Sequence, residues 1–396
     1  MNESKYTYFE ECKKRYLSDL DSQMLDFWFK YGLDHDNGGI FTCVDRDGTL
    51  MDTTKSVWFQ GRFAYICARA YNTIRKDERW LQASRSTIDF IERHCFDTDG
   101  HMFFEVTAQG APIRRRRYVF SECFAAIAMS EYSIASGDGT YAQKALDLFF
   151  SIKRMLETPG FLPAKSFEPA VGHSITMILI NVAICIRRAI SHEALDEQIE
   201  KSISDIKNLF LKPEYKALME SVAPDGSLID TCAGRTINPG HCIETAWFIL
   251  EEARYRNWDS ELVALAQTIF DWSWQWGWDE EFGGIVNFRD CKGFPHQDYS
   301  QDMKFWWPHC EAIITSLYLY VATGDEKYIE YHKAIDEYTY ANFPDPEFGE
   351  WYGYLHRDGS PAHRAKGNIF KGPFHIPRMM IECSILCDEI LKSNKA

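Results

Sequence analysis

The most constraining feature of the sequence is a pattern that recurs six times along its 396 residues. Each copy has a turn containing Gly with Asp, Asn or Glu, then alternating apolar residues, then the start of an apolar helix. The clearest turns are GLDHDNGG from Gly32, GWDEEFGG from Gly277 and FPDPEFGE from Phe343. The residues that mark the six helix starts are 55 to 68 positions apart: Trp58, Tyr118, His173, His241, His309 and His375. Six repeats of this length fill the chain.

The segments between the turns have the periodicity of amphipathic helices. Apolar residues recur every three or four positions over residues 8–31, 80–95, 140–156 and 259–276. About sixty residues suffice for two helices and a loop, so each repeat is predicted to be a helical hairpin. Strands are expected only in small hairpins at the turns.

Six helical hairpins can close into a ring, with one helix of each hairpin inside and the other outside. Closure buries every inner helix and removes the need for capping repeats, which an open superhelix would require. We therefore expect an all-α fold, an (α/α)6 barrel formed by residues 1–396 as a single domain, with β-hairpins at one rim. An open superhelix is the alternative.

In the closed form, the six helix starts converge on one cavity. Flat aromatic faces beside imidazole, carboxylate and guanidinium groups would suit a sugar. The residues expected there as substrate contacts or catalysts are Trp58, Arg62, Tyr118, His173, His241, Glu244, Trp307, His309, Glu311, His375 and Arg378.

The histidines at the helix starts suggest acid/base chemistry. In NPGHCIETAW, the Pro-Gly pair before His241 is explained by the helix start itself, since proline fits the first turn and glycine permits a tight approach. The positive end of the helix dipole disfavours imidazolium there, so a neutral ring is expected near pH 7. Two neutral imidazoles across a cavity could remove a proton from one face of a carbon and return one to the other.

The carboxylates near these histidines allow other roles. His241 and Glu244 are three apart, so they share a helical face and could ligate a metal. No companion carboxylate-rich motif is present, so no metal is expected, and Glu244 is predicted to orient His241 or hold a hydroxyl group. Glu311 could do the same, or could form an ion pair with Lys304 or Arg378.

Composition excludes several other classes of protein. The net charge of −15 argues against nucleic acid as a partner, although the run RRRR at residues 114–117 could be a solvated loop or an anion or sugar contact. Twelve cysteines without a CxxC pair indicate free thiols in a reducing compartment. The N-terminus lacks a signal-peptide core, and the apolar run from Ser174 is too short to span a bilayer. We expect a cytoplasmic protein without membrane or nucleic-acid partners.

Five ordered motifs resemble the N-acylglucosamine 2-epimerase family, which includes cellobiose 2-epimerases and aldose-ketose isomerases acting on mannose or sulfosugars. They are KSVWFQGR from Lys55, GHSITMIL from Gly172, NPGHCIETAW from Asn238, KFWWPHCEA from Lys304 and KGPFHIPR from Lys371. The resemblance implies an (α/α)6 barrel with His241 and His375 as the acid/base pair. It also implies that the sugar and its charged intermediate are held by Arg62, His173, Glu244, Glu311 and Arg378.

The resemblance implies interconversion of N-acetylglucosamine and N-acetylmannosamine by proton transfer at C2 of the open-chain sugar. Histidine at position 309 is closer to the N-acylglucosamine 2-epimerases than to cellobiose 2-epimerases, which usually have glutamine there. Family members suggest a homodimer without a required cofactor. The chain has no P-loop, since GFLPAKS from Gly160 lacks the second glycine, and a nucleotide effect stays open.

Three alternatives remain. An aldose-ketose isomerase acting on mannose, glucose or a related free sugar would use the same chemistry but deliver the proton to C1. A glycoside hydrolase with the same barrel would need two carboxylates on either side of the scissile bond. A non-catalytic sugar-binding protein would not need paired imidazoles.

Overall fold

The computed structural model describes residues 3–115, 118–161 and 169–393. Two short π-helical segments, η1 (Leu20–Leu25) and η2 (Ile206–Phe210), interrupt a largely α-helical chain. The α-helices are α1 (Glu3–Asp19), α2 (Asp26–Tyr31), α3 (Val57–Thr73), α4 (Glu78–His94), α5 (Phe120–Ser136), α6 (Thr140–Glu157), α7 (His173–Ala189), α8 (Glu193–Asp205), α9 (Pro239–Tyr255), α10 (Ser260–Gly277), α11 (Trp306–Thr323), α12 (Lys327–Asn342) and α13 (His375–Ser393).

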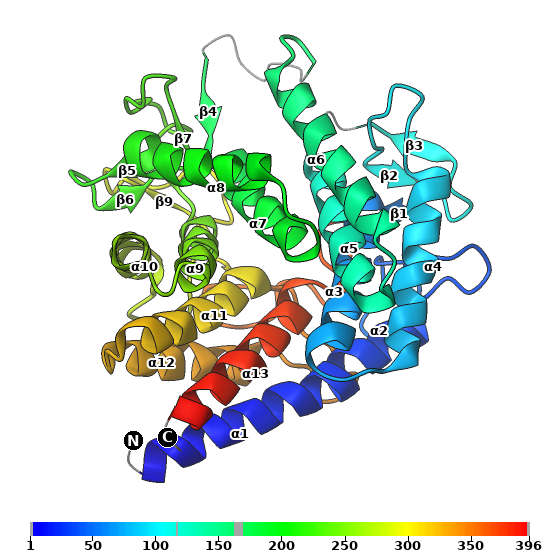
Figure 1. Ribbon diagram of the computed structural model, residues 1–396. Coiled ribbons are helices and arrows are strands. Elements are labelled where there is room, and N and C mark those ends of the chain that lie inside the picture. The colour runs from blue at the N-terminus through cyan, green and yellow to red at the C-terminus, as the bar shows by residue number, and fades with distance from the viewer. Residues whose placement is uncertain (1–2, 116–117, 162–168, 394–396) are drawn as a thin grey trace.

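Helices α3, α5, α7, α9, α11 and α13 form an inner ring. Each packs on the next, and α13 returns to contact α3, so the ring is closed. The outer helices α4, α6, α8, α10 and α12 each pack on the inner helix that precedes them. Figure 1 shows N-terminal α1 beside C-terminal α13, so the two ends of the chain form the sixth hairpin. The expected (α/α)6 barrel is confirmed, and the open superhelix is excluded.

The predicted helices correspond closely to observed ones. Residues 8–31 lie in the continuous helical segment α1, η1 and α2, and residues 80–95, 140–156 and 259–276 lie in α4, α6 and α10 with ends shifted by one or two positions. Two outer helices, α4 and α10, begin at aspartate caps: Asp77 accepts the backbone N–H of Arg79 at 3.0 Å, and Asp259 accepts that of Glu261 at 3.0 Å. Such caps satisfy N–H groups that have no partner within the helix.

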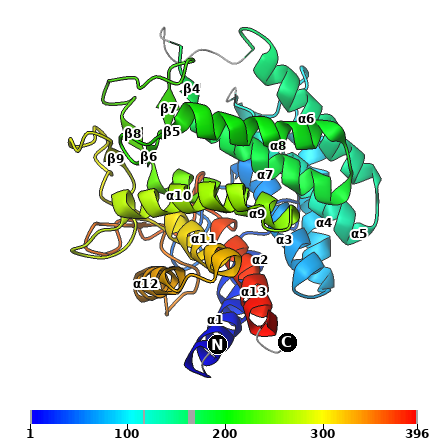
Figure 2. The same cartoon turned by 60° about the vertical axis from the view of Figure 1, so that its left-hand side comes forward.

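The strands are only two or three residues long. They are β1 (Lys55–Ser56), β2 (Glu105–Val106), β3 (Pro112–Arg114), β4 (Val171–Gly172), β5 (Leu211–Lys212), β6 (Ala217–Leu218), β7 (Ser221–Val222), β8 (Thr236–Ile237), β9 (Arg289–Asp290), β10 (Lys304–Phe305) and β11 (Tyr354–Leu355). Figure 2 shows β4 to β9 gathered beside one end of α7 to α10.

Most strand pairing joins consecutive repeats rather than the two sides of one turn. The strands β1, β4, β8 and β10, which precede inner helices, pair antiparallel with β2, β7, β9 and β11 of the following loops. In the predicted turns from Gly32, Gly277 and Phe343, the pairing is limited to isolated bridges such as Leu33 with Ile40 and Trp278 with Ile285, whereas β2 and β3 pair within a single loop. The small strands therefore fix the position of each inner helix start relative to its neighbour.

Buried lysines connect the turns to the helix starts. Lys55 Nζ donates to Asp34 Oδ2 at 2.7 Å, and in the fifth repeat Lys304 Nζ donates to Asp279 Oδ2 at 2.9 Å. Both lysine side chains are fully buried, and burial, which the aspartate opposes, lowers the pKa of Lys304 to about 8. The alternative of an ion pair between Lys304 and Glu311 is therefore wrong, because Lys304 forms its ion pair with Asp279 instead.

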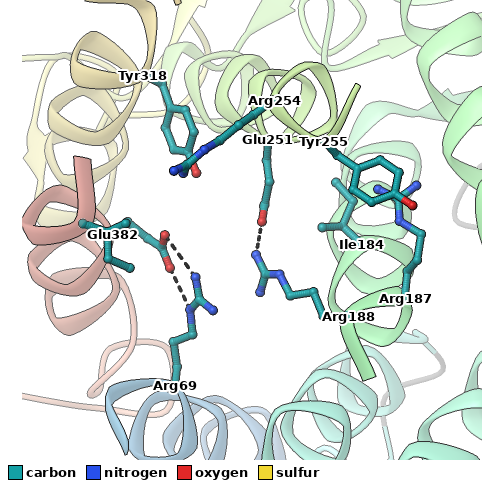
Figure 3. Close-up of a pocket in the computed structure, with 10 residues that line it drawn as sticks. Arg69, Ile184, Arg187, Arg188, Glu251, Arg254, Tyr255, Tyr318 and Glu382 are labelled. Atoms are coloured by element: carbon teal, nitrogen blue, oxygen red, sulfur yellow. Dashed lines mark hydrogen bonds and ion pairs between the residues drawn. The ribbon is translucent and has the colours of Figure 1, made fainter. Parts of the chain in front are cut away.

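The opposite end of the ring is closed by ion pairs around a cavity of about 330 Å³. Figure 3 shows Arg69 bound to Glu382 and Arg188 bound to Glu251. Glu131 lies 3.7 Å from the guanidiniums of both Arg69 and Arg188. These pairs link α13, α3, α5, α7 and α9 in order, so opposite charges reinforce the ring closure. Each of these guanidiniums is compensated by a carboxylate of the chain.

Two inner helices approach unusually closely where they carry cavity residues. A Cβ atom added at Gly61 of α3 would lie 2.5 Å from the backbone carbon of Phe124 in α5. Glycine is therefore required for the close contact between these helices.

Among the described residues, no helix combines the length and the apolar character needed to cross a membrane. The apolar run from Ser174 forms α7, a helix of the inner ring.

Candidate active site

A cavity of about 520 Å³ lies at the end of the ring where the inner helices begin. Its walls come from the first two turns of all six inner helices, with additional aromatic residues from the adjoining strands and loops. The lining residues are Trp58, Arg62, Phe120, Phe124, Ser174, Met177, Ile178, His241, Glu244, Phe305, Trp306, Trp307, Tyr354, Phe370, Phe374, His375 and Arg378.

His241 and His375 both lie close to the same indole, that of Trp307. The centroid of the His241 ring is 5.1 Å from that of Trp307, and the centroid of the His375 ring is 5.8 Å from it. The two imidazole centroids are therefore no more than about 11 Å apart. Gly240 makes room for this arrangement, because a Cβ atom there would lie 2.5 Å from the Trp307 ring. The glycine of the Pro-Gly pair thus serves a close side-chain contact as well as the helix start.

The His375 ring is held by a buried carboxylate. Its Nδ1 is 2.7 Å from Oε1 of Glu311, whose Oε2 accepts a hydrogen bond from Nε1 of Trp247 at 2.6 Å. Arg378 also donates to Glu311 at 2.6 Å and to Glu244 at 2.5 Å. With the Nδ1 proton donated to Glu311, Nε2 of His375 carries the lone pair at the cavity. The alternative of an ion pair between Glu311 and Arg378 is confirmed by this geometry.

The His241 ring has an equivalent partner that the sequence interpretation missed. Its Nδ1 is 3.0 Å from Oε2 and 3.1 Å from Oε1 of Glu220, which lies between β6 and β7. Asn238 caps α9 by accepting the backbone N–H of His241 at 3.2 Å, which fixes the first turn of the helix. In both catalytic candidates, a glutamate therefore holds the ring through Nδ1. The other nitrogen, Nε2, is the one that can exchange a proton with a substrate.

The two imidazoles differ in basicity. Burial lowers the pKa of His375 well below its usual value, and the nearby Arg378 guanidinium lowers it further. Burial also disfavours the charged form of His241, but the Glu220 carboxylate more than compensates, so the pKa of His241 is raised. The expected shift toward a neutral ring thus agrees with His375. For His241 the pKa shifts in the opposite direction, because Glu220 outweighs the effect of burial.

Arg62 presents an unpaired guanidinium to the cavity. Its guanidinium carbon is 4.1 Å from the ring centroid of Phe124 and 4.8 Å from that of Phe374. Among the residues that the structure describes, no carboxylate lies within ion-pair distance of Arg62. Burial lowers its pKa to about 9, although the Glu244 carboxylate opposes this shift. A buried cation without a partner favours a ligand that brings negative charge or a strong acceptor.

Glu244, Glu311 and His375 also bring three possible metal-ligand atoms within 4.8 Å of one another. However, one terminal nitrogen of Arg378 donates to both carboxylates and lies 3.2 Å from Nδ1 of His375. A guanidinium therefore already provides the positive charge at the centre of this group.

Four predicted contact residues do not line the cavity. The His309 ring is fully buried behind α11, where its Nδ1 donates to the Phe305 carbonyl at 2.6 Å and its Nε2 accepts the N–H of Ile285 at 3.0 Å. His173 is also fully buried, with Nε2 2.9 Å from the Thr245 hydroxyl. Burial lowers the pKa of His309 to about 3 and that of His173 to about 4. These interactions make both rings structural.

Tyr118 is the third such residue, and it is half-buried with its ring 6.5 Å from that of Phe120. It follows the basic run, of which Arg114 pairs with Glu105 at 3.2 Å and Arg115 with Asp97 at 2.5 Å. Arg116 and Arg117 lie outside the described residues. Glu311 likewise does not line the cavity, but it holds His375 and Arg378, which do.

The chain matches known proteins over nearly its whole length. A sequence model described as N-acylglucosamine 2-epimerase (GlcNAc 2-epimerase) matches residues 39–372. The N-acylglucosamine 2-epimerase of Bos taurus is 34% identical, covering 96% of this chain and 91% of that protein. The cellobiose 2-epimerase of Ruminococcus albus is 24% identical, covering 92% and 96% of the two chains.

Solved structures confirm the fold independently. The cellobiose 2-epimerase of Bacillus thermoamylovorans B4167 superimposes with a TM-score of 0.84 at 20% identity, covering 94% of this chain and 98% of that one. A D-mannose isomerase superimposes with a TM-score of 0.78 at 20% identity, covering 98% of each chain. On the family match and the identity to the bovine protein, the chain belongs to the N-acylglucosamine 2-epimerase family of carbohydrate epimerases and isomerases.

Proposed function

We propose that the protein interconverts N-acetylglucosamine and N-acetylmannosamine by moving a proton at C2 of the open-chain sugar. The observation that carries this proposal is the pair of cavity-lining imidazoles beside Trp307, each with a glutamate at Nδ1. The choice of an N-acetyl sugar is supported by the higher identity to the bovine N-acylglucosamine 2-epimerase than to a cellobiose 2-epimerase.

The reaction removes a weakly acidic proton next to the C1 aldehyde. His375, with a lowered pKa and a free Nε2, is the base that accepts the C2 proton. His241, with a raised pKa, is the acid that gives a proton to the opposite face. The pair carries one proton in total, so the reverse reaction uses the same groups with their roles exchanged.

The intermediate is an enolate whose negative charge collects on the C1 oxygen. Arg62 supplies a guanidinium that has no carboxylate partner among the described residues, so its charge is available to that oxygen. Arg378 is already bound to Glu244 and Glu311, so its main role is to hold these carboxylates in position. Glu311 and Glu220 act through the imidazoles as positioning residues.

The two carboxylates held by Arg378 do not suit a glycoside hydrolase. The Oε1 atoms of Glu244 and Glu311 accept hydrogen bonds from the same Arg378 nitrogen, so they lie together on one side. Hydrolysis requires carboxylates on either side of the scissile bond. Proton transfer between imidazoles therefore fits the site better than hydrolysis.

Proton NMR in D2O with each sugar offered separately tests the function. N-acetylmannosamine should give N-acetylglucosamine that carries deuterium at C2. A ketose product from mannose or glucose would instead support an isomerase, and no exchange with any sugar would refute both activities.

Single histidine variants test the two-base assignment. His241→Asn and His375→Asn should each lower epimerisation at least about 100-fold. Each should retain C2 deuterium exchange in only one epimer, because the remaining imidazole reaches only one face. Near-normal epimerisation by either variant would contradict the assignment.

A further inference from the structure

The cavity wall has a polar part and an apolar part that come from different helices. The charged and imidazole groups come from α3, α9 and α13. The wall formed by α5 and α7 presents Phe120, Phe124, Met177 and Ile178, whose side chains have no oxygen or nitrogen atoms. A sugar with hydroxyl groups on every carbon would leave those hydroxyls unpaired against this wall.

The apolar wall lies across the ring from His375 and Trp307. Because the inner helices follow one another around the ring, α7 is opposite α13, which carries His375, and α5 is opposite α11, which carries Trp307. A C2 atom between the imidazoles would therefore direct one of its substituents toward α5 and α7.

The C1 oxygen, the polyol chain and the acylamino group, which are attached to the reacting carbons, require different surroundings. The C1 oxygen requires a cation, which Arg62 provides. The polyol chain requires hydrogen-bonding partners, which Asp298, His296 and Tyr299 offer in the hollow that adjoins His241. Only an acylamino group ends in a methyl that forms no hydrogen bonds, so it is the group that matches the apolar wall.

Helix α7 also offers a hydroxyl beside the apolar residues. Ser174, Met177 and Ile178 are spaced so that they share one helical face, and all three line the cavity. Ser174 lies one turn closer to the start of the helix and can donate to an amide carbonyl while the methyl packs deeper.

We infer that the α5–α7 wall binds the acyl group of an N-acylated sugar, and that Met177 and Ile178 determine which acyl groups are accepted. This inference rests on the proposed epimerase function. A hydroxyl added to the acyl methyl would be buried without a partner, which lowers kcat/KM by about five- to 150-fold.

The test compares kcat/KM for N-acetylmannosamine and N-glycolylmannosamine, which differ by that hydroxyl. The wild-type protein should prefer the acetyl sugar at least about fivefold. Met177→Gln and Ile178→Thr, which place a polar group on the wall, should each reduce this preference at least about threefold. The matched control is Met129→Gln, since Met129 is buried in α5 but does not line the cavity.

The preference is the ratio of the two kcat/KM values measured with the same variant. A loss of folded protein lowers both values equally and leaves the ratio unchanged. A wild-type ratio near one, or an unchanged ratio in both wall variants, would overturn the inference while leaving the epimerase function intact. If the wild-type protein turned over neither amide sugar, the proposed function would fail, and the inference with it. A reduced ratio in the wall variants but not in Met129→Gln supports the inference.

Discussion

His309 occupies the same position in α11 as Gln60 does in α3, the fourth residue of an inner helix. In the first repeat, Oε1 of Gln60 accepts the N–H of Ile40 at 2.8 Å, and its Nε2 donates to the carbonyl of Ser56 at 3.1 Å. In the fifth repeat, His309 makes the same two connections, to the N–H of Ile285 and to the carbonyl four residues earlier. The imidazole therefore holds the Gly-Gly-Ile turn against the helix start, as the amide does in the first repeat.

His309→Gln should consequently preserve both connections and leave kcat/KM within about threefold of wild type, with a stability change below about 1.5 kcal/mol. His309→Leu leaves the buried N–H of Ile285 without a partner, which costs about 1 to 3 kcal/mol. For a chain of 396 residues, that cost lowers the Tm by about 1 to 4 °C.

Urea unfolding followed by tryptophan fluorescence measures the stability, and N-acetylmannosamine turnover measures kcat/KM. The argument is refuted if His309→Gln loses more than about tenfold in kcat/KM without a change in unfolding, because the ring would then contact the sugar. Equal free energies of unfolding for His309→Leu and His309→Gln would also contradict the argument. The hydrogen bond from the N–H of Ile285 would then make no measurable contribution to stability.

Two further predictions follow from charged groups. Glu220→Gln removes the carboxylate that raises the pKa of His241, so the basic limb of the kcat/KM profile, where imidazolium is lost, should move to lower pH. A profile whose basic limb does not move would show that Glu220 is not the cause. Arg69→Met removes the cation bound to the buried Glu382, and one of the two cations beside Glu131, and should cost about 3 to 5 kcal/mol in urea unfolding. The matched control is Arg79→Met, because Arg79 pairs with Asp77 at the surface and its side chain is 62% exposed. This variant should change the free energy of unfolding by less than about 1 kcal/mol. Similar losses in both arginine variants would contradict a stabilising role for the ion pairs that close the ring.

The fold was predictable because the repeat signal is strong and largely local. Helical periodicity and turn residues recur in each unit, so the number of hairpins and their order follow from the chain. The pairing of strands between consecutive repeats was not predictable. Strands of two residues, such as β8 and β9, are too short for a sequence pattern to identify the strands that they pair with. The sequence therefore predicted pairing within each turn instead of between consecutive repeats.

The site was only partly predictable, because sequence spacing locates a helix start but not the direction of each side chain. Neighbouring residues in a helix point about 100° apart, so a difference of one position decides whether a ring faces the cavity or the surrounding turns. His241 is the third residue of α9 and lines the cavity, whereas His309 is the fourth residue of α11 and lies behind it. Glu220 was missed for a different reason, since it lies in a loop 21 residues before His241.

The same repeat that places the two imidazoles also explains why they differ. His241 and His375 both begin inner helices, so the helix dipole acts on each in the same direction. Their carboxylates do not act equally. Glu311 forms an ion pair with Arg378, which offsets its charge, whereas Glu220 pairs with no arginine among the described residues and acts mainly on His241. The unequal carboxylates thus bias the shared proton toward His241. A chain whose six repeats remained identical would have no such bias, and so acid and base roles depend on the loops between the helices.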